Sequence, residues 1–306
     1  MLISTSLLLL PTALAWGPRS YYNWRVLWSD AFPGPSGTLP NKTNWNIIDG
    51  YLNVNDEWET YVASPHEVQI SGGATVQLVP WRNSSISPHG WSSGRIESSY
   101  TFVPQPGVRT MAEGLIRFGP HPTTAKQGIW PAFWVLGDAI RHGTGWPACG
   151  ELDILETING QLTGYGTIHC GVFPGGVCNE PTGRGATVPI PNQEWQRWRI
   201  VWDRTWRDWT CESVTWYMND QEFHRVVAAQ IGDAAIWASL AHQPLFFILN
   251  VAVGGGWPGP PNDQTRDGYG SMMEVAYVAL YSSAERWHPP GAGGGAHDDH
   301  RRLYDL

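Results

Sequence analysis

A short apolar segment, residues 150–156 (GELDILE), carries three carboxylates and is the strongest structural constraint in the chain. Its apolar residues predict a buried β-strand, and alternation along a strand sends Glu151 and Asp153 to the same face. Glu156 has the wrong parity for that face. A β-bulge that inserts one residue near Ile154 or Leu155 would correct the parity, so we expect a bulged strand with all three acids lining one cleft.

Two carboxyl groups that face each other across a cleft are the chemical requirement of glycoside hydrolysis, in which one is protonated and the other ionised. We therefore expect Glu151 to be the nucleophile and Glu156 the general acid and base. Asp153, between them, would hold a proton or hydrogen bond and keep the two titrations apart. The alternative is a solvated edge strand with acids for solubility, which the apolar intervening positions disfavour.

The rest of the chain is typical of an all-β protein. Turns rich in Gly and Pro separate short alternating segments, a rhythm that predicts a β-sandwich; examples are residues 74–79, 95–102, 198–202 and 213–218. Residues 245–251 are apolar on both faces and predict a central strand, whereas only residues 233–241 look helical. A sandwich of this kind reaches 306 residues as a single domain.

The acidic segment and several others resemble glycoside hydrolase family 16. Laminarinase-type members carry the signature Glu-x-Asp-x-x-Glu, and the extra residue favours that branch over the lichenases and plant xyloglucan enzymes. Asn159 departs from the broad signature and is closer to fungal members. The other matching segments are residues 55–61 (NDEWETY), 93–96 (SGRI), 129–136 (IWPAFWVL), 250–255 (NVAVGG) and 257–259 (WPG).

The resemblance implies a β-jelly-roll sandwich with an open substrate cleft on its concave face. It also implies a retaining endo-glycosidase that hydrolyses β-1,3 or mixed β-1,3/1,4-glucan without a cofactor. Some family members carry a structural calcium, but no ligand cluster in this sequence identifies one, and we expect no metal site. The same acids would serve a transglycosylase, an agarase or a carrageenase, while a non-catalytic β-glucan-binding protein is the alternative outside enzymes.

Several residues outside the acidic strand are candidates for binding sugar. Trp130 and Trp134 are four residues apart on a predicted strand and share a face, and the family resemblance has Trp134 stack on sugar, although core packing would also explain either. Trp257 lies in a Gly-Pro loop. Asn55 and Arg95 match family positions that contact sugar hydroxyls, and Glu57 could instead pair with Arg95.

His169 is a further candidate. It lies on a predicted strand, residues 166–169, which we expect to pair with the acidic strand across a turn at Asn159 and Gly160. It would hydrogen-bond an acid or the sugar, or serve as a buried structural histidine.

The termini and the cysteines indicate export. Residues 1–15 are typical of a signal peptide, residues 16–285 would form the catalytic domain, and residues 286–306 a flexible tail. Exported cysteines are expected to pair: Cys170 and Cys178 bracket a turn-rich loop, which would leave Cys149 for Cys211, although sequence alone does not choose among the three pairings. Asn41 and Asn83 begin glycosylation sequons. We expect a secreted, soluble monomer.

Charge and aromatic content restrict the partner. The formal net charge is −8, which disfavours nucleic acid and sulfated polymers but not a neutral polysaccharide such as β-glucan. The chain has 19 Trp, more than a core easily absorbs because each indole N–H needs a partner, so some are expected to face sugar. No apolar run is long enough to anchor the chain in a membrane.

Overall fold

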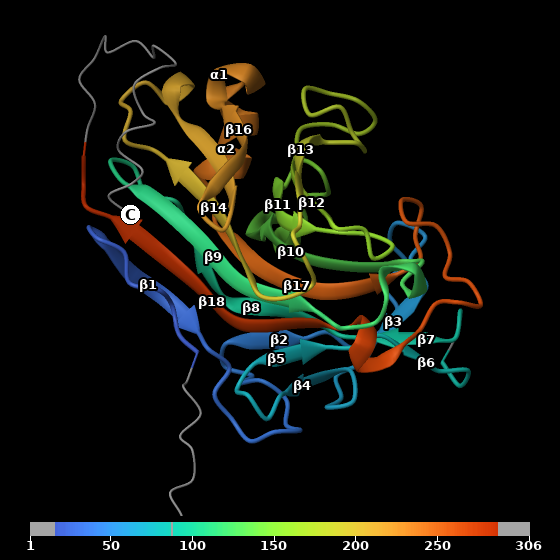
Figure 1. The fold of residues 1–306 in the computed structure, drawn as a ribbon. Coiled ribbons are helices and arrows are strands. Elements are labelled where there is room, and N and C mark those ends of the chain that lie inside the picture. Colours follow the sequence, from blue (N-terminus) through green and yellow to red (C-terminus); the bar gives the residue numbers. More distant parts are fainter. Residues whose placement is uncertain (1–15, 87, 287–306) are drawn as a thin grey trace, which may run out of the picture.

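The computed structural model describes residues 16–86 and 88–286 and shows two curved, stacked β-sheets (Figure 1). The predicted signal peptide and residues 287–306 of the predicted tail lie outside the described residues. The predicted β-sandwich of the jelly-roll class is confirmed. Among the described residues, no helix is long and apolar enough to cross a membrane.

The sheet that carries the acidic strand, called here the cleft sheet, has the order β13-β12-β11-β10-β17-β8-β2, with every pairing antiparallel. Its strands are β2 (Trp45–Ile47), β8 (Arg95–Phe102), β10 (Ile129–Gly137), β11 (Glu151–Glu156), β12 (Thr163–His169), β13 (Arg184–Pro189) and β17 (Leu245–Val253).

The second sheet, called here the outer sheet, has the order β16-β15-β14-β9-β18-β5-β4, and β1 also pairs with β18. Its strands are β1 (Trp24–Asp30), β4 (Val68–Ile70), β5 (Val76–Leu78), β9 (Arg109–Phe118), β14 (Gln196–Asp203), β15 (Ser213–Met218), β16 (Gln221–Val227) and β18 (Met273–Ser283). A small third sheet contains β3 (Glu59–Tyr61), β6 (Trp81–Arg82) and β7 (Trp91–Ser93).

Helices are short and few within the described ranges. The predicted helix is confirmed as α2 (Ala234–Ala241). The Asp233 carboxylate caps its N-terminus by accepting hydrogen bonds from two backbone N–H groups. The preceding α1 (Ala228–Ile231) was not predicted. The described residues also contain four 3₁₀ turns: η1 (Thr123–Ala125), η2 (Asp138–His142), η3 (Trp209–Cys211) and η4 (Gly268–Ser271).

The main hydrophobic core lies between the two sheets. All nine residues of β17 are buried, which confirms that segment as a central strand. On β11, Leu152, Ile154 and Leu155 all belong to this core. Two consecutive core residues in one strand require a break in the alternation of side chains, and this break sets the direction of Glu156.

The predicted bulge is present at this break. On β10, Phe133 pairs with Leu155 and Trp134 pairs with Asp153, which leaves Ile154 as the extra residue. The register of β11 against β12 shifts in the same interval. Glu151, Asp153 and Glu156 therefore share the face of the cleft sheet that points away from the core.

A residue of the outer sheet contacts the bulged strand β11 across the core. The Trp216 indole on β15 donates a hydrogen bond to the Asp153 backbone carbonyl, at 2.7 Å. Gly166 on β12 leaves the space for that indole, because a Cβ atom there would lie 2.6 Å from Trp216 Cδ1 and 2.9 Å from the Phe223 ring. The close contact between the sheets thus depends on a glycine opposite a large aromatic residue.

Replacing Gly166 by Ala should lower the free energy of unfolding by about 1 to 3 kcal/mol, because the added methyl group overlaps the Trp216 and Phe223 rings. Thermal or urea unfolding would measure the change. Gly145→Ala is the matched control, since a Cβ there meets no atom within 4 Å. Equal stability of the two variants would contradict the proposed packing.

Candidate active site

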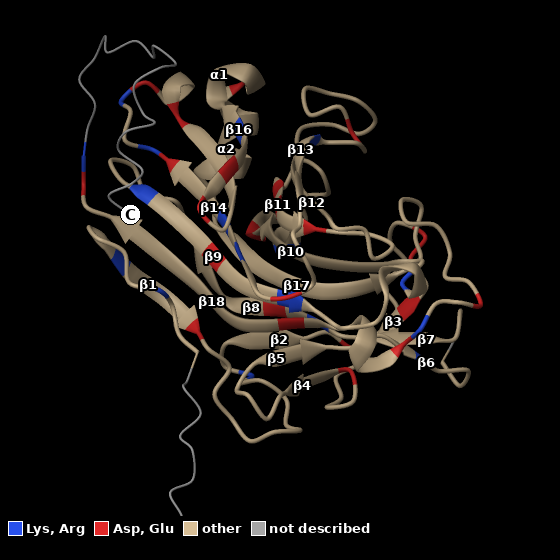
Figure 2. Ribbon diagram, in the orientation of Figure 1, with Lys and Arg blue, Asp and Glu red and all other residues tan. Residues whose placement is uncertain are grey.

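The three acids of β11 lie on the outward face of the cleft sheet, and acidic residues mark this strand in Figure 2. Asp153 is 3% exposed and Glu156 9% exposed, whereas Glu151 is partly exposed. Carboxyl groups are rarely buried this deeply unless they are paired or hydrogen-bonded, so Asp153 and Glu156 are expected to have partners.

Two neighbours on adjacent strands contact the acids. The Trp130 indole on β10 donates a hydrogen bond to Glu156 Oε1, at 2.9 Å. On β12, His169 Nε2 lies 3.4 Å from Asp153 Oδ2. That oxygen is buried and makes no hydrogen bond, so the His169–Asp153 contact is an ion pair with imperfect hydrogen-bond geometry.

Burial and mutual repulsion control the protonation of the acids. Burial and the nearby Asp153 carboxylate raise the pKa of Glu151 to about 8. The same two causes raise the pKa of Glu156 well above its usual range, although the Trp130 hydrogen bond opposes the rise. Closely spaced carboxyl groups of this kind cannot all ionise, so the cluster retains a proton at neutral pH.

His169 supplies the compensating positive charge. Burial opposes its charged form, but the contacts with Asp153 and Glu180 and the field of the acids raise its pKa to about 11. Its Nδ1 lies 2.7 Å from Glu180 Oε2. These contacts favour the imidazolium form of His169, and they agree with both predicted roles, contact with an acid and a buried structural histidine.

One group of side chains in the described part of the chain has the spacing for a metal ion. Ligand atoms of Glu151, Asp153 and His169 all lie within 4.8 Å of one another. A transition metal bound there would need a neutral imidazole. In this structure His169 Nε2 is instead paired with the Asp153 carboxylate, which is the arrangement of an imidazolium rather than of a metal ligand.

Aromatic side chains form one wall beside the acids. The exposed Trp257, 44% accessible, meets Trp130 edge to face with ring centroids 5.4 Å apart. Tyr165 of β12 meets Trp257 in the same way at 4.9 Å. An exposed indole held by two aromatic neighbours is a suitable platform for the apolar face of a sugar ring.

Trp134 lies further along β10, on the same face as Trp130. Its indole donates to Asn250 Oδ1 at 2.8 Å, and the Arg95 guanidinium carbon lies 5.1 Å from its ring centroid. Asn250 in turn donates to the Tyr61 hydroxyl. Both tryptophans are partly exposed, and Trp134 also packs against the apolar cluster that contains Leu136, Phe246 and Ile248.

Asn55 and Arg95 have mainly protein partners. Arg95 pairs with Glu97 Oε1 at 2.7 Å, which corrects the alternative that it pairs with Glu57. Asn55 donates a hydrogen bond to Glu57, which is also hydrogen-bonded to Glu59. The backbone carbonyl of Asn55 accepts from Gly256 N, and this places Asn55 against the loop that carries Trp257.

Sequence reasoning missed three residues around the cluster: Glu180, Asn250 and Trp146. The Trp146 ring centroid lies 5.6 Å from that of His169, and its side chain is 38% exposed. Asn250 had a detectable signal, since it is the polar position in an otherwise apolar strand. Glu180 had none, because its contact with His169 arises only when the intervening loop folds back.

The cysteine predictions divide in two. The Cys170–Cys178 disulfide is confirmed, with a Cα–Cα distance of 5.5 Å. The pairing of Cys149 with Cys211 is wrong, because both are free. Cys149 is buried among Leu136, Phe246 and Ile248 of the cleft sheet, whereas Cys211 lies in η3, directly before β15 of the outer sheet.

Comparisons with known proteins agree with this geometry. Residues 67–183 match the family model described as "XgeA-like, catalytic GH16 domain". The structure of an endo-1,3-β-glucanase from Streptomyces sioyaensis is 32% identical with a TM-score of 0.80, covering 87% of this chain and 99% of that one. An endo-β-1,3-glucanase from Pyrococcus furiosus is 28% identical with a TM-score of 0.67, covering 86% and 95%.

A curated relative extends the agreement. The β-glucanase of Rhodothermus marinus is 26% identical over 271 residues, which span 87% of this chain and 86% of that protein. A β-sandwich with paired carboxyl groups on one face of its cleft sheet, flanked by tryptophans, defines a glycoside hydrolase acting on O-glycosyl bonds. The chain belongs to glycoside hydrolase family 16.

Replacing Asp153 by Asn should lower the pKa of Glu151 from about 8 toward its usual range, because it removes a negative neighbour that disfavours ionisation. Titration of ¹³C-labelled Glu carboxyl groups by NMR would measure this shift. Asp208→Asn, at a fully exposed position in the outer sheet's connections, should leave the Glu151 titration unchanged. A Glu151 titration unaffected by Asp153→Asn would show that repulsion is not the cause.

Proposed function

We propose that this protein is a secreted, retaining endo-glucanase that hydrolyses β-1,3 or mixed β-1,3/1,4-glucan by double displacement. The observation that carries the proposal is the bulge at Ile154, which brings Glu151 and Glu156 to one face on either side of Asp153. Glycoside hydrolysis with retention uses two carboxyl groups about 5 to 5.5 Å apart, and the proposal expects this separation between Glu151 and Glu156.

The two acids divide the chemistry. Glu151 attacks the anomeric carbon while Glu156 protonates the departing glycosidic oxygen, and Glu156 then deprotonates the water that hydrolyses the glycosyl-enzyme. The raised pKa of Glu156 keeps its proton available at neutral pH. Glu151 must be ionised to attack; with its pKa raised to about 8, only a fraction is ionised at neutral pH, and the His169 cation favours that fraction. This mechanism uses no cofactor.

The remaining candidates would bind sugar along the cleft. Trp130 would orient the Glu156 carboxyl through its hydrogen bond, and Trp257 would stack on a sugar ring. Trp134, beside Asp153 in the strand register, would contact sugar near the cleavage point. Arg95 and Asn55 would contact sugar hydroxyl groups through N–H donors of their side chains.

The substrate class follows from charge and from the relatives. The relatives described above are glucanases, two of them named for β-1,3 linkages. The formal net charge of −8 suits a neutral polysaccharide and disfavours sulfated galactans, nucleic acid and anionic membranes. The predicted signal peptide at residues 1–15, the sequons at Asn41 and Asn83, and the Cys170–Cys178 disulfide support export, and the proposal takes the exported protein to be a soluble monomer.

Two alternatives differ from hydrolysis in separate ways. A transglycosylase would use the same acids with sugar in place of water as the acceptor. A non-catalytic glucan-binding protein would need no buried, proton-sharing carboxyl cluster. The presence of Glu151, Asp153 and Glu156 on one face of the cleft sheet therefore favours an enzyme over a binding protein.

Digestion of laminarin, lichenan and agarose, with analysis of product lengths, tests the proposal. Laminarin or lichenan should be cut internally to short oligosaccharides, and agarose should remain intact. The Glu151→Gln and Glu156→Gln variants should each keep less than about a tenth of wild-type turnover, a loss of more than about 1.4 kcal/mol in transition-state binding, because each loses a chemical role.

The variants also provide the control. Each exchange of Glu for Gln preserves volume, so circular dichroism and the melting temperature should show a folded protein. If the wild type leaves both glucans intact and degrades agarose, or only joins oligosaccharides, the proposed activity is wrong. Full turnover by Glu151→Gln would instead show that Glu151 is not the nucleophile, while the proposed glucanase activity would stand.

A further inference from the structure

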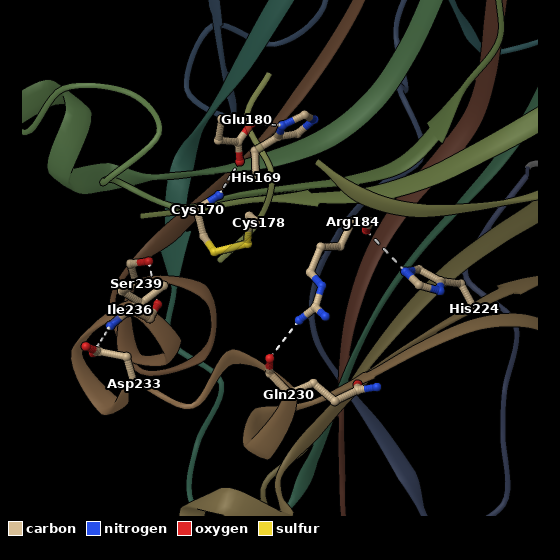
Figure 3. Close-up of a disulfide and its surroundings, with 10 residues drawn as sticks. All are labelled: His169, Cys170, Cys178, Glu180, Arg184, His224, Gln230, Asp233, Ile236 and Ser239. Carbon is tan, nitrogen blue, oxygen red and sulfur yellow. Dashed lines mark hydrogen bonds and ion pairs between the residues drawn. A yellow bond between two sulfur atoms is a disulfide. The ribbon is translucent and has the colours of Figure 1, made fainter. Parts of the chain in front are cut away.

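A disulfide-closed loop follows β12 and returns a buried carboxylate to the active-site histidine. The loop begins at Cys170 and is closed by its bond to Cys178, and Glu180 comes two residues later. Figure 3 shows the Glu180 carboxyl beside the His169 ring, with the disulfide directly below. Glu180 has no part in the chemical steps proposed for Glu151 and Glu156.

Glu180 is rigidly held. Its side chain is fully buried, and its two oxygens have separate partners: Oε2 lies 2.7 Å from His169 Nδ1, and Oε1 accepts from Cys170 N at 2.7 Å. Its backbone N–H and carbonyl form a reciprocal pair with Gly175 inside the loop. Burying an ionised carboxylate is costly unless it faces a positive charge, and His169 is the cation it contacts.

His169 thus lies between two carboxylates. Its Nδ1 faces Glu180, and its Nε2 faces Asp153 Oδ2 at 3.4 Å. The other charged groups that act on this cluster are Glu151 and Glu156 from β11 and Arg95 from β8. An imidazole with one nitrogen fixed by a carboxylate has its ring orientation determined and its second N–H directed.

We propose that Glu180 is a positioning residue for the glycosidase reaction, which holds His169 as a cation with Nε2–H directed at Asp153. The inference rests on the proposed function above. Through His169, Glu180 sets the charge of the acidic cluster without touching the substrate. The disulfide contributes by fixing the loop from which Glu180 returns, so that its carboxylate does not have to be ordered at each turnover.

The test is Glu180→Gln, which keeps the volume and the acceptor for Cys170 N but removes the anion. Imidazole ¹⁵N NMR should show His169 doubly protonated at pH 8 in the wild type, where its pKa is about 11, and titrating at lower pH in the variant. The kcat on glucan should fall at least about tenfold with KM within about twofold, because the change acts on the reacting acids rather than on sugar binding.

The pH profile gives a second readout. Loss of the His169 cation disfavours ionisation of Glu151, and the field of His169 on Glu151 outweighs that of Glu180, so the acidic limb of kcat should move to higher pH in Glu180→Gln. Glu180→Asp, which keeps the charge, should restore the doubly protonated ring and most of kcat. A merely structural role would lower the melting temperature without moving either titration.

The matched control is Glu212→Gln, another buried carboxylate paired with a histidine, His242, and also bonded to Trp237 and Arg204. It should lower stability but leave the His169 resonances and the pH profile unchanged. The proposal is overturned if wild-type His169 is neutral at pH 7, or if Glu180→Gln and Glu212→Gln behave alike. Because the NMR titration needs no substrate, its outcome stands even if no glucan is cleaved.

Discussion

The active site depends on a single extra residue, Ile154, in the pairing of β11 with its neighbours. Strand alternation would otherwise place Glu156 in the core and one of its apolar neighbours in the cleft. The bulge lets Ile154 and Leu155 both bury their side chains, and the hydrophobic gain from that burial holds three repelling carboxyl groups on the opposite face. Hydrophobic packing on the core side of β11 thus offsets the repulsion among the carboxyl groups on its cleft side.

Close approach of the two sheets makes that packing possible. Glycines on the cleft sheet face large aromatic rings of the outer sheet: a Cβ at Gly166 would lie 2.6 Å from Trp216, and one at Gly164 would lie 2.3 Å from Trp198. The Trp216 indole then reaches the Asp153 carbonyl, which fixes the bulged backbone. Several tryptophans are therefore structural, and the exposed Trp257 and partly exposed Trp130 and Trp134 remain for sugar.

Sequence predicted the parts of this structure that local pattern controls. Strands β8 and β15 lie where the alternation of residues 95–102 and 213–218 placed them, and the bulge follows from the parity of one acid. The Cys170–Cys178 disulfide closes a short loop whose turn residues were visible. In each of these cases the relevant residues are near in sequence or constrained by the two-residue period of a strand.

Contacts that depend on tertiary packing could not be predicted in this way. Glu180 reaches His169 only because the loop folds back, and Arg95 pairs with Glu97 on its own strand rather than with Glu57. The count of four cysteines suggested a second disulfide, but Cys149 packs in an apolar cluster against the cleft sheet and forms no bond with Cys211. Both errors arose because the sequence shows how many cysteines there are and which charges could pair, but not which of these residues lie close together in the fold.

The central claim is that the bulged strand makes Glu151 the nucleophile of a double displacement. A 2-deoxy-2-fluoro laminaribiosyl fluoride should trap the glycosyl-enzyme, because the 2-fluoro substituent slows both formation and hydrolysis of the intermediate, whereas the good fluoride leaving group restores the rate of formation alone. Mass spectrometry of the intact protein and of its peptic peptides should find one glycosyl group, attached to Glu151. A label on Asp153 or Glu156, or no label while a β-glucan releases the α-anomer first, would contradict this account.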